Sequence, residues 1–464
     1  MENIYLTNYC VSGIRCLSKP ASLSFYKERI EKHPDTRNFR IKALFGKNGS
    51  GKSGIILSAQ ILREILLRSP SLSEDRFQAL LENSVCKKTG ELVISAEFMA
   101  ELEIPILYAY TLRLIPEDRG TFRISEEILQ ARKASGRKAG YSTLFHIRNG
   151  AVELFSCDDR EVGELVRDRT MNLLNKSSLV SLLIAKPEIR EMTADAVLKE
   201  KAFAGIQALH DFASSLLVLC ADAPEPWNSS LETQISGRLL RRGPERSVSS
   251  DFRRKTVQIL PEENLIPKED FPAFEAEVKK LTAFLRVFRR DLQDIEIQKK
   301  EDRFCYHCPL VLNYSDILIP AERESSGIRR LITLFSFLNG MAKGSIVFID
   351  DLDAGLHEVY LCSLLEYLMR EGKGQLCFTA QNAGLMDTLK KNKKSMDFLS
   401  DDQTIYPWTR NGNCSPSKLY RNGDMEGFHF QIDPADFSSC FESAFSAESQ
   451  DTDPAVPADR PAGF

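Results

Sequence analysis

Short apolar runs separated by turn residues dominate the first third of the chain. Residues 41–45 form one such run, and between residues 91 and 156 apolar and polar residues alternate with the period of strands. Within the second range, Asn149-Gly150 separates two alternating runs, which is a strong signal of a β-hairpin. The pattern therefore predicts a buried strand at 41–45 and an antiparallel β lobe over about 91–156.

Apolar residues take up helical spacing from about residue 160 to residue 300. We expect helices at 162–174, 177–185, 193–221 and 271–292. No heptad pattern is sustained over three or four repeats, so this block is expected to be a helical insertion and not a long coiled coil. Strand-like runs return from Arg303 onward.

The predicted organisation has four parts. Residues 1–156 and 301–430 are expected to be two halves of one core domain, with the helical insertion at 157–300 between them. Residues 431–464 carry scattered acids and prolines with almost no aliphatic side chains. Such a segment buries too little apolar surface to fold, so we expect disorder there.

Composition narrows the functional classes only slightly. The 464 residues carry a formal net charge of −4 at pH 7, with 43% hydrophobic and 27% charged residues, as in ordinary globular proteins. The net charge gives no overall attraction to nucleic acid or anionic membrane. No apolar run approaches the roughly 18 residues of a spanning helix, and no signal peptide is recognisable. The 11 cysteines are scattered, several of them in apolar segments, which favours reduced thiols and a cytoplasmic location.

One close pair of cysteines occurs in Cys305-Tyr306-His307-Cys308. It lacks a second pair at metal-binding spacing, and it lies in a strand-like run where alternate residues face opposite ways. Packed strand cysteines are therefore the favoured interpretation, and zinc is the less favoured one.

The nine residues from Phe45 to Ser53 carry the clearest chemistry in the sequence. They fit G-x-x-x-x-G-K-[ST], and Lys47, Asn48, Gly49 and Ser50 fill the variable positions. A strand precedes this loop and a helix over about 54–68 follows it, which is the order that a phosphate-binding loop requires. The fixed positions of the pattern are Gly46, Gly51, Lys52 and Ser53.

These residue types suit a nucleoside triphosphate with Mg²⁺. Glycines let consecutive backbone N–H groups surround a phosphate, and the following helix turns its positive end toward the anion. Lys52 supplies a charge for the β- and γ-phosphate oxygens, and the Ser53 hydroxyl can bind Mg²⁺. The sequence does not decide between ATP and another triphosphate.

A second half of this site is predicted about 300 residues later. Residues 345–349 form a buried-strand run that ends in Asp350-Asp351. Asp350 is expected to hold the metal, and Asp351 to orient the attacking water or accept its proton. Just upstream, Glu324 to Arg330 opens a helix with small polar residues that can present N–H groups and hydroxyls to an anion. A later strand over 375–379 ends at Gln381-Asn382.

The order of these segments resembles the head domain of ABC-type ATPases related to SMC and RecF proteins. Within that group the chain looks most like the AAA_15 type of AAA family ATPase, found in prokaryotic abortive-infection and other anti-phage systems. The resemblance covers roughly 1–66, 91–156 and 303–430. The segments that carry it are Ile4 to Tyr9, Gly46 to Ser53, Glu324 to Arg330, and Phe348 to His357.

The resemblance implies an α/β P-loop NTPase of ABC-ATPase head type, with a mixed sheet, an antiparallel β lobe and a helical insertion. It also implies a head-to-head dimer in which Ser325, Ser326 and Gly327 of one subunit contact the γ-phosphate held by the other. The segment from Asp353 to His357 would then cross the dimer interface.

Two departures from the family pattern predict slow hydrolysis. Asp351 stands where most relatives have Glu, and its carboxylate is one methylene shorter. Gln381 stands where relatives usually have a His that contacts the γ-phosphate, and an amide cannot carry charge or shuttle a proton. We therefore expect Lys52, Asp351 and Gln381 to form a catalytic set with low turnover.

The leading hypothesis is an ATP-dependent switch or scaffold, in which ATP closes a dimer or a larger homo-oligomer. It would control a separately encoded effector, such as a nuclease or toxin. The alternative is a RecF- or SMC-like ATPase that clamps DNA. An ATP-binding subunit of a transporter is disfavoured, because the insertion is too long and no coupling glutamine is recognisable after the first helix.

Basic residues gather at three places along the chain, where contact with nucleic acid can be envisaged. Solvated surface charge is the favoured interpretation, because acids lie nearby. The clusters are Arg132, Lys133, Arg137 and Lys138; Arg238, Arg241, Arg242, Arg246, Arg253, Arg254 and Lys255; and Lys390, Lys391, Lys393 and Lys394.

Overall fold

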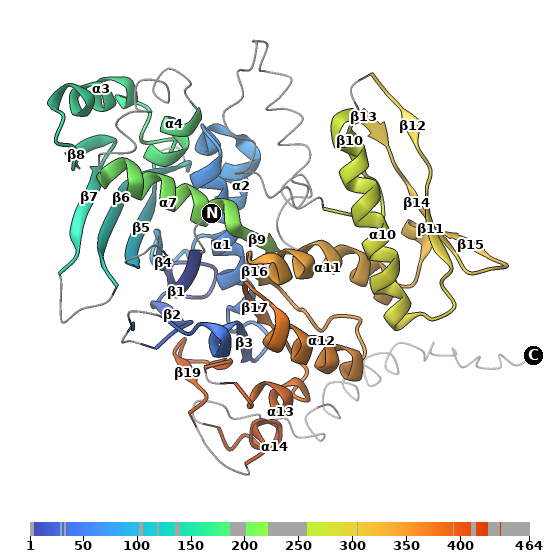
Figure 1. Cartoon of the computed structure of the whole chain (residues 1–464). Helices are drawn as coiled ribbons and strands as arrows, with labels where there is room; N and C mark the ends of the chain where they lie inside the picture. Colours follow the sequence, from blue (N-terminus) through green and yellow to red (C-terminus); the bar gives the residue numbers. More distant parts are fainter. Residues whose placement is uncertain are drawn as a thin grey trace, which may run out of the picture.

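The computed structural model arranges the chain as two large sheets with helices between and around them, and a smaller third lobe (Figure 1). It describes residues 4–27, 30–31, 34–101, 105–117, 120–134, 140–185, 201–220, 258–303, 305–392, 394–409, 414–425 and 437.

The first sheet has seven strands, each antiparallel to its neighbours. Its order is β2 (Ala21–Ser24), β1 (Ile4–Ser12), β4 (Leu92–Ala100), β5 (Ile106–Pro116), β6 (Phe122–Lys133), β7 (Ser142–Arg148) and β8 (Ala151–Phe155). The predicted hairpin is present, since Arg148 pairs with Ala151 around Asn149 and Gly150, whose φ angles are 48° and 78°. The expected antiparallel β lobe is therefore confirmed.

The second sheet has six strands. Its order is β19 (Ile405–Pro407), β18 (Met396–Leu399), β3 (Ile41–Gly46), β17 (Gln375–Thr379), β16 (Ile346–Ile349) and β9 (Leu216–Leu219). All neighbours are parallel except β18 and β19. The carboxyl ends of β3, β17 and β16 therefore lie at one edge of this sheet.

Helix α1 (Lys52–Leu67) lies between the two sheets and is buried almost completely. Packing from both sides buries the polar residues Ser58, Gln60 and Glu64 of this helix as well as its apolar ones. Ser58 on α1 shares a 2.7 Å hydrogen bond with Tyr9 of β1. The Gln375 side chain joins the sheets directly, through bonds of 2.7 and 2.9 Å to the backbone N–H and carbonyl of Leu6.

The remaining helices form two groups. The first group packs in the same core as α1, against the seven-stranded sheet, and consists of α2 (Asp75–Ser84), α3 (Arg160–Thr170), α4 (Leu179–Ala185) and α7 (Lys201–Ser215). On the other face of the six-stranded sheet lie α11 (Ser326–Lys343), α12 (Glu358–Glu371), α13 (Leu385–Leu389) and α14 (Pro416–Arg421).

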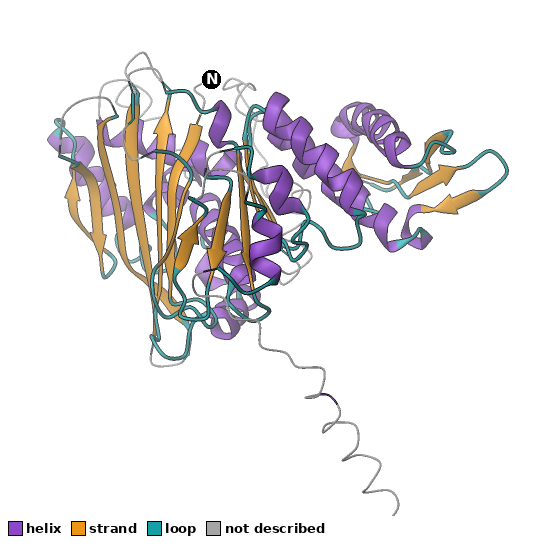
Figure 2. Ribbon diagram, turned by 90° about the horizontal axis from the view of Figure 1, so that it is seen from below, coloured by secondary structure: helices purple, strands orange, loops and turns teal. Residues whose placement is uncertain are grey.

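The third lobe consists of α10 (Phe271–Phe288) and two small antiparallel sheets (Figure 2). One sheet contains β10 (Leu265–Pro267), β13 (Cys305–His307) and β12 (Lys300–Glu301). The other contains β11 (Asp294–Ile297), β14 (Leu310–Asn313) and β15 (Leu318–Pro320). A shared core joins this lobe to the first half of α11.

The interpretation of 157–300 as a purely helical block is wrong. The predicted helix over 193–221 ends at Ser215, and residues 216–219 form β9, which pairs with β16 in the six-stranded sheet. Strands β10 and β11 also fall inside this range. Residues 186–200, 221–257 and the tail, apart from Phe437, lie outside the described residues. Among the described helices, none is long and apolar enough to cross a membrane.

Candidate functional site

The loop from Gly46 to Ser53 connects β3 to α1 with a backbone that only some residues tolerate. Gly49 and Gly51 have φ angles of 77° and 108°, in the left-handed region that favours glycine. At Gly51 a Cβ atom would also meet Leu17 at 2.6 Å, and at Gly46 it would meet the Leu399 carbonyl oxygen at 2.6 Å. The positive φ angles therefore favour glycine at positions 49 and 51, and the close contacts of a Cβ atom oppose other residues at positions 46 and 51.

Lys52 turns its side chain back into the loop. Its Nζ donates hydrogen bonds of 2.8 Å to the carbonyl oxygens of Gly46 and Lys47, and the residue is 7% exposed. Burial lowers the pKa of Lys52, while the carboxylates of Asp351, Asp350 and Asp353 act to raise it. The loop lysine and the acidic end of β16 thus share one electrostatic environment, although they are about three hundred residues apart in sequence.

Asp350 is buried at the end of β16, and Thr379 at the end of the neighbouring β17 holds it. The Thr379 hydroxyl donates a 2.6 Å hydrogen bond to Asp350 Oδ1. The same oxygen of Thr379 accepts a 2.7 Å bond from the Asp351 backbone N–H. Thr379 was not among the residues predicted from sequence, because its role depends on β17 lying next to β16.

Asp351 has a φ of 46°, in the left-handed region that Asp tolerates better than most residues. Its carbonyl and that of Asp350 each accept a 2.8 Å hydrogen bond from Nη2 of Arg330 on α11. Helix α11 is therefore tied directly to the acidic pair. Arg330 ends the predicted signature segment, but the sequence alone predicts no role for its side chain.

Asp353 organises the turn after β17. Its Oδ2 accepts hydrogen bonds from the backbone N–H groups of Gln381 (2.9 Å) and Asn382 (2.7 Å). Gln381 is exposed, so its side chain lies at the surface. Its backbone is held next to Asp353, which follows the acidic pair in the chain. His357, which ends the segment predicted to cross the dimer interface, accepts a 3.3 Å hydrogen bond from Val359 N–H and caps α12.

The predicted signature segment begins α11. Ser325 is the N-cap, and its Oγ accepts a 3.4 Å hydrogen bond from Ile328 N–H. Ser325 and Ser326 are exposed. Gly327 packs against the segment after the acidic pair, since a Cβ there would approach the Gly355 carbonyl to 2.9 Å. The segment is thus accessible and close to residues 353–357 of the same chain.

The polar residues of the loop differ in their exposure and in their hydrogen bonds. Asn48 and Gly49 are exposed, and Lys47 pairs at 2.5 Å with Asp401 beside the loop. The Ser50 hydroxyl is buried and has no hydrogen-bond partner among the described residues. An unpartnered buried hydroxyl costs free energy unless a further group accepts from it or donates to it. Ser53, the first-turn hydroxyl of α1, and Asp350 are the residues that fit a hard divalent cation.

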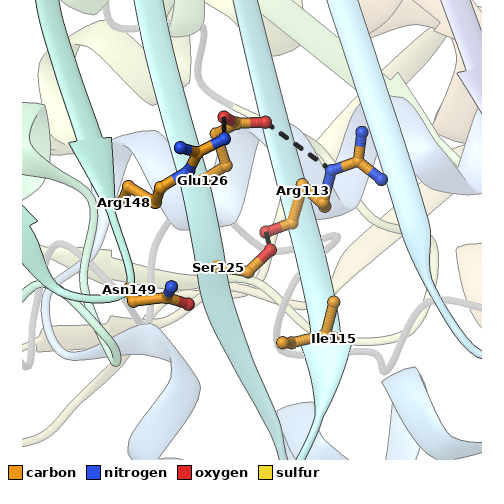
Figure 3. A pocket seen from close by; sticks show the side chains of 6 residues that line it. All are labelled: Arg113, Ile115, Ser125, Glu126, Arg148 and Asn149. Carbon is orange, nitrogen blue, oxygen red and sulfur yellow. Dashed lines mark hydrogen bonds and ion pairs between the residues drawn. The ribbon is translucent and has the colours of Figure 1, made fainter.

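A separate pocket of about 340 Å³ lies on β5, β6 and β7 of the β lobe (Figure 3), and no residue of the Gly46–Ser53 loop lines it. Its lining residues are Arg113, Ile115, Ser125, Glu126, Arg148 and Asn149. The Glu126 carboxylate lies between the two guanidinium groups, 3.7 Å from Arg113 and 3.6 Å from Arg148. Glu91 pairs with Arg113 as well. The charges of this pocket are balanced, and none of the predicted site residues lines it.

Lys390, Lys391 and Lys394, the described residues of the third basic cluster, each have a carboxylate, hydroxyl or carbonyl group nearby. Lys391 pairs with Glu366 at 2.6 Å, Lys390 lies 3.7 Å from Asp387, and Lys394 donates to Ser24 and to the Tyr26 carbonyl. In the first cluster, Arg132 lies over the Tyr141 ring. Arg137, Lys138, Lys393 and the whole second cluster lie outside the described residues.

Comparison with known proteins gives only distant similarities. The sequence matches no protein-family model and no curated protein. The structure is similar to an SMC head domain with an extended coiled coil bound to the C-terminal domain of ScpA, from Pyrococcus furiosus. That alignment has a TM-score of 0.39 and 12% identity, and covers 88% of this chain and 96% of the other. It is also similar to the recombination mediator RecF with ATP, with a TM-score of 0.36, 13% identity and coverages of 88% and 98%.

Proposed function

We propose that this chain is an ABC-type ATPase that binds Mg–ATP at the loop from Gly46 to Ser53 and hydrolyses it slowly. The observation that carries the proposal is the meeting of two distant segments at one sheet edge. The strand that leads into the loop and Lys52 (β3) and the strand that leads to Asp350 (β16) both pair in parallel with β17, so their carboxyl ends lie at the same edge. The carboxylates of Asp351 and Asp350 act there to raise the pKa of Lys52. A glycine loop, a lysine and a strand of the same sheet that ends in carboxylates are the parts that phosphoryl transfer requires.

Each group of residues at this site would have its own role in binding or hydrolysis. The N–H groups of the loop and the Lys52 ammonium would bind the phosphates, in place of the carbonyl contacts that Lys52 now makes. Mg²⁺, held by Ser53 and Asp350, would neutralise charge on the phosphate oxygens. Asp351 would orient a water or accept its proton, and Gln381 could only donate or accept a hydrogen bond. With these two groups we expect turnover well below ~10 per second, because a misplacement near 1 Å costs on the order of a hundredfold.

The proposal extends to a second copy of the chain. Ser325, Ser326 and Gly327 would contact the γ-phosphate bound by the other copy, in a head-to-head dimer. Their exposure at the start of α11 supports this arrangement. Arg330 on α11 is hydrogen-bonded to the backbone of the acidic pair. A change at the nucleotide site would therefore move α11, and with it the third lobe whose core α11 shares.

The biological role that we propose is control of a separately encoded effector in anti-phage defence, which rests on the family resemblance of the motifs. A DNA-clamping role is the alternative. The described lysines at 390, 391 and 394 have nearby acceptors, which favours the switch. A mobility-shift assay at two salt concentrations separates the two, since tight and steeply salt-dependent duplex binding by the purified protein alone supports the clamp.

The direct test is ATP binding measured by calorimetry with and without Mg²⁺. Lys52→Ala is expected to weaken ATP binding at least tenfold, and Asp350→Asn to remove the dependence on Mg²⁺. Lys391→Ala, which breaks only a surface ion pair, serves as the matched control. Unchanged affinity in Lys52→Ala would contradict the proposal. A pull-down with ATP, using the native chain and Lys52→Ala, then identifies an effector that depends on the nucleotide.

A further inference from the structure

A mixed cluster of metal-binding side chains lies in the third lobe, at the turn between β12 and β13. One carboxylate oxygen of Asp302, the Sγ of Cys305 and one ring nitrogen of His307 all lie within 4.8 Å of one another. Cys305 and His307 occupy alternate positions of β13, so their side chains emerge on the same face. The Asp302 N–H donates a 2.9 Å hydrogen bond to the Cys305 carbonyl, and this turn brings the carboxylate onto the same side.

We propose that Asp302, Cys305 and His307 bind a borderline divalent metal ion, with Zn²⁺ as the preferred ion. Thiolate and imidazole ligands select ions of this class over Mg²⁺ and Ca²⁺, and a carboxylate is also a common zinc ligand. Bonds of about 2.1 Å to nitrogen and oxygen and about 2.3 Å to sulfur, in a tetrahedron, place ligand atoms about 3.4–3.6 Å apart. The three groups therefore need shifts of about 1 Å to close around the ion, which an exposed turn allows. Water would complete the coordination.

Glu263 gives the histidine the partner that metal-bound imidazoles usually have. Its Oε1 lies 2.9 Å from Nδ1 of His307. A carboxylate on one ring nitrogen fixes the ring and leaves the lone pair of the other nitrogen for a metal. Two carboxylates, those of Asp302 and Glu263, and one ammonium group, that of Lys268, act on the Cys305 thiol, and Lys268 is also hydrogen-bonded to Glu301. A divalent cation would balance this local negative charge.

The fourth residue of the Cys305–Cys308 run lies outside the cluster. Cys308 is fully buried in the core of the third lobe, and its N–H donates to the Asn264 carbonyl at 2.9 Å. The two cysteines therefore do not chelate together. Packing is the correct interpretation for Cys308, whereas Cys305 faces His307 and Asp302. A bound metal would fasten the β12–β13 turn onto a lobe whose core includes Ile328 and Leu331 of α11.

Co²⁺ is the probe for this site, because a cobalt–thiolate bond gives a charge-transfer band in the near ultraviolet. The full chain is treated with chelator, kept reduced and titrated with Co²⁺ in excess Mg²⁺, which occupies oxygen-only sites. We expect a band that saturates at one Co²⁺ per chain and is bleached by Zn²⁺. Cys305→Ser should abolish it, and Asp302→Asn, at an exposed residue, should weaken binding at least tenfold. Cys414→Ser, which removes an exposed thiol elsewhere, should leave both unchanged.

Absence of the band in the native chain overturns the site, as does a band of full intensity in Cys305→Ser. Native affinity in Asp302→Asn overturns the three-ligand assignment. If Cys305→Ser does not fold, as judged by circular dichroism, His307→Gln decides the question, because unchanged affinity in that variant contradicts the proposal. None of these outcomes depends on ATP binding or hydrolysis, so this proposal and the ATPase proposal fail separately.

Discussion

The Thr379 hydroxyl holds two consecutive residues of the acidic end of the candidate site. It donates to Asp350 Oδ1 at 2.6 Å and accepts from Asp351 N–H at 2.7 Å. Thr379→Val keeps the shape of the side chain but leaves both groups without this partner. A buried polar group that loses its partner costs about 1–3 kcal/mol, so we expect the free energy of unfolding in urea to fall by about 2 kcal/mol. Thr379→Ser keeps the hydroxyl and is the control.

If Thr379 had only a structural role, its substitution would change stability but not the binding of Mg²⁺. The second measurement is therefore the Mg²⁺ dependence of ATP affinity. With Asp350 free to rotate, Thr379→Val should need at least tenfold more Mg²⁺ for half-maximal ATP binding, while Thr379→Ser should match the native chain. A valine variant with native Mg²⁺ dependence would show that Thr379 does not position Asp350 for the metal.

Glu127 is a buried carboxylate that makes the stability of the β lobe depend on pH. It accepts hydrogen bonds from Tyr110 and from the N–H of Leu179 at the start of α4. Burial raises the pKa of Glu127 from 4.5 to about 7, although both hydrogen bonds act to lower it. Between pH 4.5 and 7 the folded state keeps a proton that the unfolded state has lost, so stability falls as pH rises through this window.

Glu127→Gln keeps the shape and hydrogen-bonding capacity of this side chain but cannot titrate. The free energy of unfolding of the native chain, minus that of the variant, should decrease between pH 4.5 and 7 by on the order of 1 kcal/mol per pH unit. It should be constant above pH 8. Urea titrations at pH 5, 6, 7 and 8 measure this difference. A difference that stays constant across the window would mean that Glu127 is already charged in the folded state at pH 5.

Residue identity alone predicts part of the candidate site. Lys52 and the glycines are recognisable because their pattern is local, and the φ angles of Gly49 and Gly51 agree with it. Thr379 and Arg330 are not recognisable, because their hydrogen bonds depend on which strands and helices become neighbours. Asp302 is missed for the same reason, since its contact with Cys305 and His307 exists only once the turn has formed.

At the scale of elements, the connection from β3 to α1 depends on Gly51. Its φ of 108° and a Cβ contact of 2.6 Å with Leu17 both oppose a side chain, whereas a Cβ at Gly49 would meet nothing within 4 Å. Gly49→Ala should cost about 1 kcal/mol of backbone strain. Gly51→Ala should cost at least about 1 kcal/mol more, since packing adds to strain. Unfolding in urea without nucleotide measures both, and equal costs would mean that Leu17 moves aside.

Elements with a clear period are predicted well from the sequence, and continuous apolar runs are not. The β lobe alternates with period two, and its strands and hairpin are confirmed. Strand β9 follows α7 without a breaker, and its residues Leu216 to Leu219 continue the apolar composition of the helix. A short apolar run fits a buried strand or a helix equally well. Pairing with β16 decides the matter, and that is a property of the tertiary structure.

At the scale of the whole molecule, three hydrophobic cores meet around the six-stranded sheet and α11. Beside the segment from Asp353 to His357, two apolar side chains are exposed at the start of α12, Val359 (64%) and Tyr360 (46%). Phe288 of α10 packs on Tyr360 at a ring-centroid distance of 5.3 Å, which extends this apolar surface to the third lobe. An apolar surface next to an exposed helix start is suited to contact with a second copy of the chain.

ATP is therefore expected to convert the monomer into a dimer. The experiment uses Asp351→Asn, which should bind ATP but turn it over about a hundredfold more slowly, so that the closed state persists during sedimentation velocity. Mg–ATP should double the mass of this variant, and Mg–ADP should not. Ser326→Arg adds a bulky charge at an exposed position, so it should bind Mg–ATP normally yet remain a monomer. A dimer that forms equally without nucleotide, or that tolerates Ser326→Arg, would place the interface elsewhere. The start of α11 would then serve only to cap its helix.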